Sequence, residues 1–222
     1  MTSQPNGLRG PRLPRSQRRA QLLEAAQVVF VERGYHAAAM DEIADRAGVS
    51  KPVLYQHFPG KLELYLALLD KHCEVLEQLV RDALAVSVDD NRDRVVATIS
   101  AYFEFVGREG AAFRMIFESD LTSVPQVRSR LDAVELACAE AIADTIAGDT
   151  GVSDERAMLL GAALAGMGQI SARYWLAAQR ETIPRDEAST LIAELAWGGL
   201  GSLPLVGADD GAPVDEAVQG AS

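Results

Sequence analysis

The sequence predicts an all-α protein of about nine helices, in which a short N-terminal three-helix domain precedes a larger C-terminal helical body. Apolar residues recur at three- and four-residue spacing along nearly the whole chain, and no segment alternates as a strand would. Hydrophobic residues make up 48% of the 222 residues and aromatic residues only 6%, a composition that favours helices. A chain of this length can build one sizeable core or two modest ones.

The two ends of the chain lack helical periodicity. Residues 1–15 contain three prolines and two glycines among arginines, which predicts a disordered basic arm. Residues 207–222 place four acidic side chains among Gly, Ala and Pro, which predicts a disordered acidic tail. Between them we expect a first domain at residues 16–62 and a body at residues 63–206.

The first helix is predicted to run from Ser16, a typical N-cap residue, to Arg33, with Gly34 as its C-terminal stop. Its buried face comprises Leu22, Ala25, Ala26, Val29 and Phe30. Two short helices are expected next, at residues 40–47 and 51–57.

A long helix is predicted at residues 61–86, directly after a Pro-Gly pair. The remaining helices are expected at residues 91–107, 111–118, 125–147, 153–180 and 184–198. Short segments that contain Gly or Pro separate them. These helices make up the body.

The formal net charge of −11 hides a strong asymmetry along the chain. Residues 1–62 hold nine Lys and Arg against five Asp and Glu, whereas the remainder holds 12 against 27. A basic front joined to an acidic body indicates contact with nucleic acid or a membrane surface through the basic part. The longest apolar run is shorter than the roughly 18 residues that span a bilayer, so we expect no membrane partner and a cytoplasmic location.

Residues 39–58 carry the pattern of a helix-turn-helix. Ala44 is small where the two helices would cross, and Gly48 permits the tight turn. The buried contacts would come from Ile43, Ala47, Val49 and Leu54. In such a unit the second helix enters the major groove of DNA and the first crosses the backbone. Taken alone, the pattern also fits two short helices of an ordinary bundle.

The stretch from Arg18 to Leu69 resembles the N-terminal domain of TetR-family transcriptional regulators. The matching residues are Val28 to Tyr35 (VVFVERGY), Ile43-Ala44, Ala47 to Ser50 (AGVS), Leu54 to Phe58 (LYQHF), Lys61 and Leu64. The resemblance implies a fold of about nine helices and a homodimer bound to a palindromic operator in double-stranded DNA, on the bacterial nucleoid. It also implies a repressor that a small apolar ligand releases. An activator, or a ligand-independent architectural protein that coats DNA, are the alternatives.

The candidate DNA contacts lie on and beside the second helix of the motif. They are Ser50, Lys51, Val53, Tyr55, Gln56, His57 and Lys61. Tyr55, His57 and Lys61 match positions that family members use on phosphates. Lys51 and Gln56 have donors that suit guanine and adenine, and Val53 suits a thymine methyl group. Ser50 caps its helix, contacts a phosphate, or does both. The alternatives are a solvated helix face and, for Val53, local packing.

The sequence departs from the family pattern just before the second helix. Ala38 and Ala39 stand where family members often carry Thr or Ser, so one helix cap is missing, a loss of about 1 kcal/mol. Arginines of a basic arm could compensate by following the DNA backbone or entering the minor groove. They are Arg9, Arg12, Arg15, Arg18 and Arg19. The alternative is a solubilising tail.

The body supplies candidates for a ligand pocket and a dimer interface. The pocket candidates are Phe103, Phe113, Phe117, Met167, Gln169, Arg173 and Tyr174. The interface candidates are Gly161, Ala165, Gly168, Leu191 and Leu195, where small residues would permit close helix approach. For both sets the alternative is an intramolecular core. No grouping of nucleophile, histidine and carboxylate, metal ligands or phosphate loop is evident, so we expect no enzyme, no cofactor and no metal site.

Overall fold

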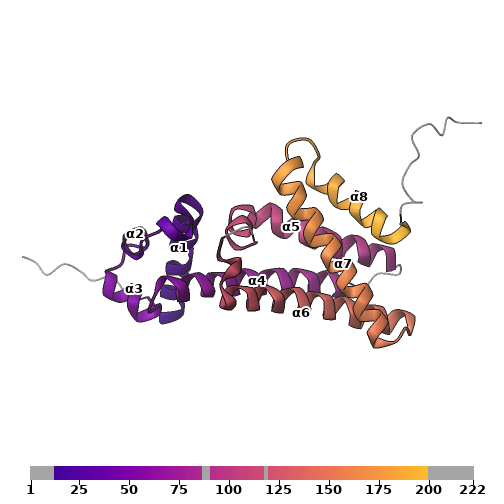
Figure 1. The fold of residues 1–222 in the computed structure, drawn as a ribbon, viewed down its shortest axis with the longest axis horizontal. Coiled ribbons are helices and arrows are strands. Elements are labelled where there is room, and N and C mark those ends of the chain that lie inside the picture. The colour runs from indigo at the N-terminus through magenta and orange to yellow at the C-terminus, as the bar shows by residue number, and fades with distance from the viewer. Residues whose placement is uncertain (1–12, 87–90, 118–119, 200–222) are drawn as a thin grey trace, which may run out of the picture.

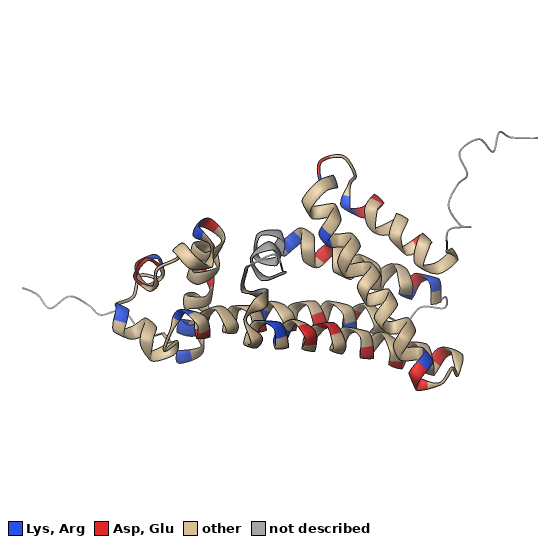
Figure 2. Ribbon diagram, in the orientation of Figure 1, with Lys and Arg blue, Asp and Glu red and all other residues tan. Residues whose placement is uncertain are grey.

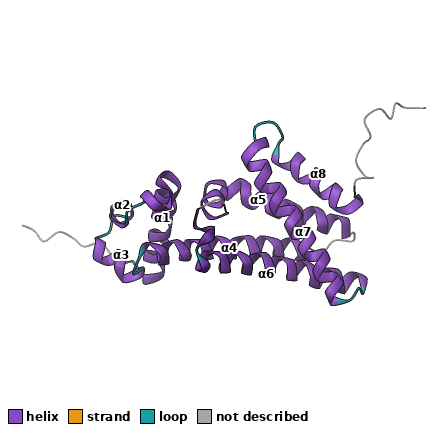
Figure 3. Cartoon of the chain, viewed as in Figure 1, coloured by secondary structure: helices purple, strands orange, loops and turns teal. Residues whose placement is uncertain are grey.

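The computed structural model describes residues 13–86, 91–117 and 120–199. This part of the chain holds eight α-helices and no strand (Figure 3), which confirms the all-α fold class. The α-helices are α1 (Arg15–Ala37), α2 (Met40–Arg46), α3 (Lys51–His57), α4 (Lys61–Ala85), α5 (Asn91–Phe117), α6 (Pro125–Thr150), α7 (Asp154–Tyr174) and α8 (Arg185–Gly198). A 3₁₀ turn, η1 (Asp120–Ser123), precedes α6, and a π-helical segment, η2 (Trp175–Gln179), follows α7. Residues 1–12 of the expected arm and the whole expected tail lie outside the described residues.

The observed helices follow the sequence prediction with one difference. The helices expected at 91–107 and 111–118 form the single helix α5, so the described chain has eight α-helices instead of about nine. Gly107 and Gly110 lie within this helix. A glycine weakens a helix by about 1 kcal/mol relative to alanine, but it keeps its backbone N–H donor and does not by itself end the helix. Gly34 has a φ of 73° inside α1, so the regular helix is interrupted at the predicted stop.

Two hydrophobic cores divide the described chain, and α4 contributes to both. The first core joins α1, α2 and α3 to the start of α4, to η1 and to the start of α6, and its fully buried side chains include Leu22, Phe30, Ile43, Leu54 and Tyr65. The second core lies in the body and contains Leu76 and Val80 of α4. Figure 1 shows α4 running from the three N-terminal helices into the body, where it lies along α6. Helix α4 therefore links the N-terminal helices to the body.

Helices α6 and α7 approach each other very closely at Gly161. A Cβ atom at this position would lie 2.4 Å from the backbone oxygen of Ala139. About two turns further along, a Cβ at Gly168 would lie 2.6 Å from the ring of Tyr102 on α5. Both glycines are buried, and so is Ala165 between them. This face of α7 therefore packs inside the chain.

Candidate nucleic-acid interface

Helices α2 and α3 form the helix-turn-helix that the sequence predicts. Gly48 adopts a φ of 63°, the left-handed conformation that the tight turn requires. The amide of Gly48 donates to the carbonyl of Asp45 (3.0 Å), and that of Val49 to the carbonyl of Ala44 (3.0 Å). The predicted buried contacts are confirmed: Ile43, Ala44, Ala47 and Leu54 are buried and Val49 is half-buried against the first core. This packing fixes α3 relative to α2.

The outer face of α3 carries most of the predicted DNA contacts. Lys51, Tyr55 and Gln56 are exposed, whereas Val53 and His57 are half-buried. Ser50 occupies the N-cap position, yet its side chain makes no capping hydrogen bond. Its hydroxyl therefore remains open to a phosphate. Figure 1 places α3 near the end of the molecule opposite α8, so the body does not cover this face.

Lys51 has an acidic partner on α2. Its ammonium lies 2.7 Å from a carboxylate oxygen of Asp41, and this hydrogen bond raises the pKa of Lys51 above its usual value. Both side chains are more than half exposed, and exposed ion pairs contribute little to stability because water screens them. Lys51 can therefore exchange Asp41 for another acceptor at low cost.

Lys61 is held by backbone carbonyl groups at the end of α1. Its ammonium donates to the carbonyl oxygens of Tyr35 (2.8 Å), His36 (3.1 Å) and Ala38 (2.9 Å). It also lies 4.7 Å from the centre of the Tyr35 ring. An ammonium group has three N–H donors, and all three are used here. Lys61 thus ties the start of α4 to the end of α1, and the phosphate contact expected from the sequence would require these bonds to break.

The missing helix cap expected at α2 is confirmed. Ala39 occupies the N-cap position, and α2 begins without a side-chain capping hydrogen bond. Asp41 and Glu42 in the first turn interact favourably with the helix dipole and offset part of this loss. Glu42 also accepts a hydrogen bond from Arg33 of α1 at 3.3 Å.

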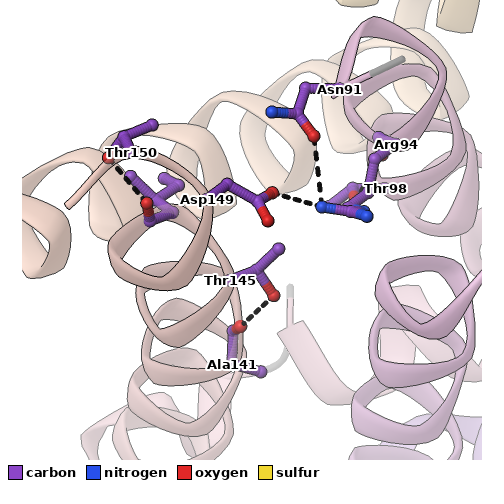
Figure 4. Close-up of polar contacts among 8 residues, drawn as sticks. Asn91, Arg94, Thr98, Ala141, Thr145, Asp149 and Thr150 are labelled. Atoms are coloured by element: carbon purple, nitrogen blue, oxygen red, sulfur yellow. Dashed lines mark hydrogen bonds and ion pairs between the residues drawn. The ribbon is translucent and has the colours of Figure 1, made fainter. Parts of the chain in front are cut away.

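The body encloses an apolar cavity of about 200 Å³. It is lined by Leu84, Asn91, Arg94, Val95, Thr98, Ile99, Ile142, Thr145, Ile146, Asp149, Thr150, Leu164 and Trp197. Some of its polar groups are paired (Figure 4): Arg94 pairs with Asp149 and donates to Asn91 (3.2 Å), while the Thr98 hydroxyl donates to the carbonyl of Arg94 (2.8 Å). The Nε atom of Arg94 is buried and has no hydrogen-bond partner among the described residues. Because Leu84 belongs to α4, the cavity reaches the far end of the helix that begins at Lys61.

The pocket residues expected from the sequence lie elsewhere. Phe103 is buried against Trp175, with ring centres 5.8 Å apart, and Gln169 donates to Glu135 at 3.0 Å. Tyr174 is 61% exposed. Met167 and Arg173 are half-buried outside the cavity lining, and the side chains of Phe113 and Phe117 are outside the described part. Sequence reasoning favoured aromatic residues, whereas this cavity is lined mainly by aliphatic and threonine side chains.

Comparison with known proteins identifies the chain. A family profile described as "Bacterial regulatory proteins, tetR family" matches residues 22–68, the span that contains α2 and α3. The "HTH-type transcriptional activator FasR" of Mycolicibacterium smegmatis is 50% identical over 197 residues, which cover 89% of each chain. The chain belongs to the TetR family.

Solved structures of TetR-family regulators have the same fold. A TetR-like transcriptional regulator from Rhodococcus sp. RHA1 is 28% identical, with a TM-score of 0.67 over 86% of this chain and 99% of that one. FadR from Bacillus subtilis, solved in complex with stearoyl-CoA, shares the fold at 18% identity, with a TM-score of 0.65 over 82% of this chain and 98% of its own. The chain is accordingly a DNA-binding transcriptional regulator of the TetR family. Within the described residues no helix is long and apolar enough to cross a membrane.

The interface candidates of this TetR-family chain divide between two faces of α7 and α8. Gly161, Ala165 and Gly168 are buried against α5 and α6, so they are not free to contact a second chain; this differs from the sequence expectation. Small residues serve close approach here, but between helices of one chain. Leu191 is 47% exposed and Leu195 half-buried on α8.

The opposite face of α7 carries exposed apolar side chains, of which sequence reasoning named only Tyr174, and that as a pocket residue. Leu159 is 73% exposed, Ile170 51% and Tyr174 61%. Leu160 of α7 and Leu191 of α8 are also exposed, so several large apolar side chains of these two helices are in contact with water. The four- and three-residue spacing of Leu159, Ala163, Gly166 and Ile170 is the signal that could have found this face.

Proposed function

We propose that the protein is a homodimeric regulator that binds a palindromic operator through α3 and responds to a small apolar ligand held in its body. The observation that carries the proposal is the exposed polar face of α3, near the end of the molecule opposite α8. A second copy related by a two-fold axis would bring an identical helix to a half-site about one helical turn away.

Each residue of this face has a role that its chemistry suits. Lys51 donates to guanine acceptors after leaving Asp41, and Gln56 pairs with adenine. Val53 contacts a thymine methyl group. The hydroxyls of Ser50 and Tyr55 and the imidazole of His57 bind phosphates, which position the helix without reading sequence. For Lys61 we retain only an indirect role, because its donors already bind three carbonyl groups.

The exposed apolar face of α7 supports the dimer. A second chain docked on Leu159, Ile170 and Tyr174 would remove these side chains from water. Full burial of a large apolar side chain stabilises a complex by about 1.5–3 kcal/mol relative to leaving it exposed. Leu191 of α8 extends this face. Disruption of the dimer by Ile170→Glu is the expected test, because a carboxylate cannot be buried there without a partner.

The cavity supports a ligand response through α4. A ligand that fills it contacts Leu84 near the end of α4, and α4 continues to the N-terminal helices. Filling would shift the separation of the two α3 helices, and affinity for DNA would change by the ligand's preference between the two states. FadR of Bacillus subtilis, which has the same fold, was solved with stearoyl-CoA; we propose an apolar or acyl-bearing effector for this chain.

The direction of regulation has two candidates. The resemblance to the TetR family implied a repressor, whereas the FasR protein that is 50% identical is named an activator. A third candidate, a ligand-independent protein that coats DNA, predicts many dispersed sites instead of a few palindromes.

Selection of operators from random DNA by the full-length protein tests the function. We expect enrichment of a palindrome, and absence of any enriched sequence would overturn the proposal. On the selected site Gln56→Ala is expected to weaken binding about 5- to 150-fold. Arg81→Ala, an exposed cation on α4 paired with Glu77, is the matched control and should bind as wild type. Transcription in vitro from a promoter carrying the site then separates activator from repressor.

A further inference from the structure

A hollow of about 470 Å³ lies between the start of α1 and the end of α3. It is lined by Leu13, Arg15, Arg18, Val53, Gln56 and His57; we call it the arginine groove. Two arginines and a histidine face it, and no lining residue is acidic. A concave surface with this composition attracts an anion, because each guanidinium presents a planar fork of donors that fits phosphate oxygens.

The cations beside this groove are fixed in place by neutral partners. Arg18 donates to the side-chain oxygen of Gln21 (2.7 Å), and Gln21 donates in turn to the carbonyl of Ala47 at the end of α2 (2.8 Å). The guanidinium of Arg19 lies 4.4 Å from the centre of the Phe58 ring. None of these contacts neutralises a positive charge. Arg18 is therefore oriented by the helix-turn-helix itself while most of its donors remain available.

The imidazole of His57 is affected by the same charges. Partial burial lowers its pKa below the usual value, and Arg15, Arg19 and Arg18 lower it further by repulsion. Near neutral pH the ring is thus uncharged and can donate one N–H. An anion in the arginine groove would relieve the repulsion among the three arginines.

We propose that the arginine groove binds a phosphodiester of the DNA backbone beside each half-site, so that Arg15 and Arg18 of α1 contact the same duplex that α3 reads. The inference rests on the proposed docking of α3. Val53 and Gln56 line both the groove and the reading face of α3, so an anion held here lies next to the base edges, where the backbone borders the major groove. Figure 2 shows Lys and Arg segments on the N-terminal helices at this end of the molecule, while along the body Lys and Arg are interspersed with many acidic segments.

The salt dependence of binding tests the assignment. Wild type, Arg15→Ala, Arg18→Ala and the double variant are titrated with the selected operator and with a random duplex over a range of salt concentrations. Because the two arginines share one phosphodiester, the double variant should reduce the slope of log K against log salt by about 0.9, and each single variant by no more than this. Affinity should fall by the same factor on both duplexes, because phosphate contacts carry no sequence information. Arg81→Ala should keep the wild-type slope.

A duplex with single neutral methylphosphonate linkages locates the contact. We expect one or two adjacent linkages at which neutralisation weakens wild type but has no further effect on the double variant. Wild-type slopes in the double variant, with unchanged unfolding of each protein, would overturn the inference. The inference would also be overturned if inorganic phosphate, at constant ionic strength, shifted the NMR resonances of the His57 ring and operator DNA did not. Failure of wild type to select any operator would instead overturn the proposed function.

Discussion

Replacement of Gly161 by alanine directly tests the close contact between α6 and α7. The new Cβ would lie 2.4 Å from the backbone oxygen of Ala139, about 1 Å inside the 3.4 Å at which ordinary contact begins, and 3.0 Å from the amide nitrogen of Ala143. Because both obstacles are backbone atoms, no side chain can rotate away. The helices must separate, and overpacking of this kind costs about 1–3 kcal/mol.

The matched control is Gly148→Ala on α6, where a Cβ meets nothing within 4 Å. Alanine there should stabilise the protein by about 0.5–1 kcal/mol through helix propensity alone. The two variants make the same chemical change, yet their effects should have opposite signs. Urea unfolding followed by circular dichroism measures the free energy of unfolding of both variants. In thermal unfolding each kcal/mol should shift the Tm by about 2–4 °C. A Gly161→Ala protein as stable as Gly148→Ala would refute the close approach.

Three further substitutions separate roles within the N-terminal helices. Lys61→Ala should lower the free energy of unfolding by about 1–3 kcal/mol, since three carbonyl groups lose their donor. The slope of log K against log salt for DNA binding should stay unchanged. A variant that is as stable as wild type but has a reduced slope would contradict this. Operator affinity of wild type should rise as the pH falls, because a bound phosphate favours the protonated ring of His57, whose pKa is lowered in the free protein by burial and by the α1 arginines. This gain in affinity should level off below the pKa of His57 in the free protein and should be absent in His57→Gln. Fluorescence anisotropy of labelled operator DNA across a range of pH measures the affinity. Asp41→Ala should strengthen binding to random duplex more than Asp45→Ala does, because only Asp41 pairs with Lys51; equal effects in the same titration would leave only the change in net charge.

The N-terminal helices were predictable because local signals specify them. Gly34 and Gly48 have positive φ in the structure, and glycine is the residue that adopts this conformation without strain. Helix α3 matches its predicted bounds, because Ser50 precedes it and a Pro-Gly pair follows its last residues. Local punctuation determined these elements, and sequence reading could recover them.

The body was less predictable because its sites depend on contacts between distant segments. The glycines of α7 indicate close packing, but sequence does not say whether the neighbour belongs to the same chain. Arg94 and Asp149 are 55 residues apart, and they meet because α5 and α6 both pack against α4. The donors of Lys61 similarly bind carbonyls more than 20 residues earlier. Motif matching indicated a phosphate there, whereas the folded chain supplies its own acceptors.

The contribution of α4 to both hydrophobic cores constrains which insertions and deletions this protein can accept during evolution. Leu69 is packed in the first core and Leu76 in the second, and both belong to one uninterrupted helix. Each residue turns an α-helix by about 100°, so a one-residue insertion between them would swing one core face away from its partners. A different C-terminal body can therefore be joined to these DNA-binding helices only where the helical register of α4 is preserved. Loops of the protein tolerate changes in length, but this short segment tolerates substitutions alone.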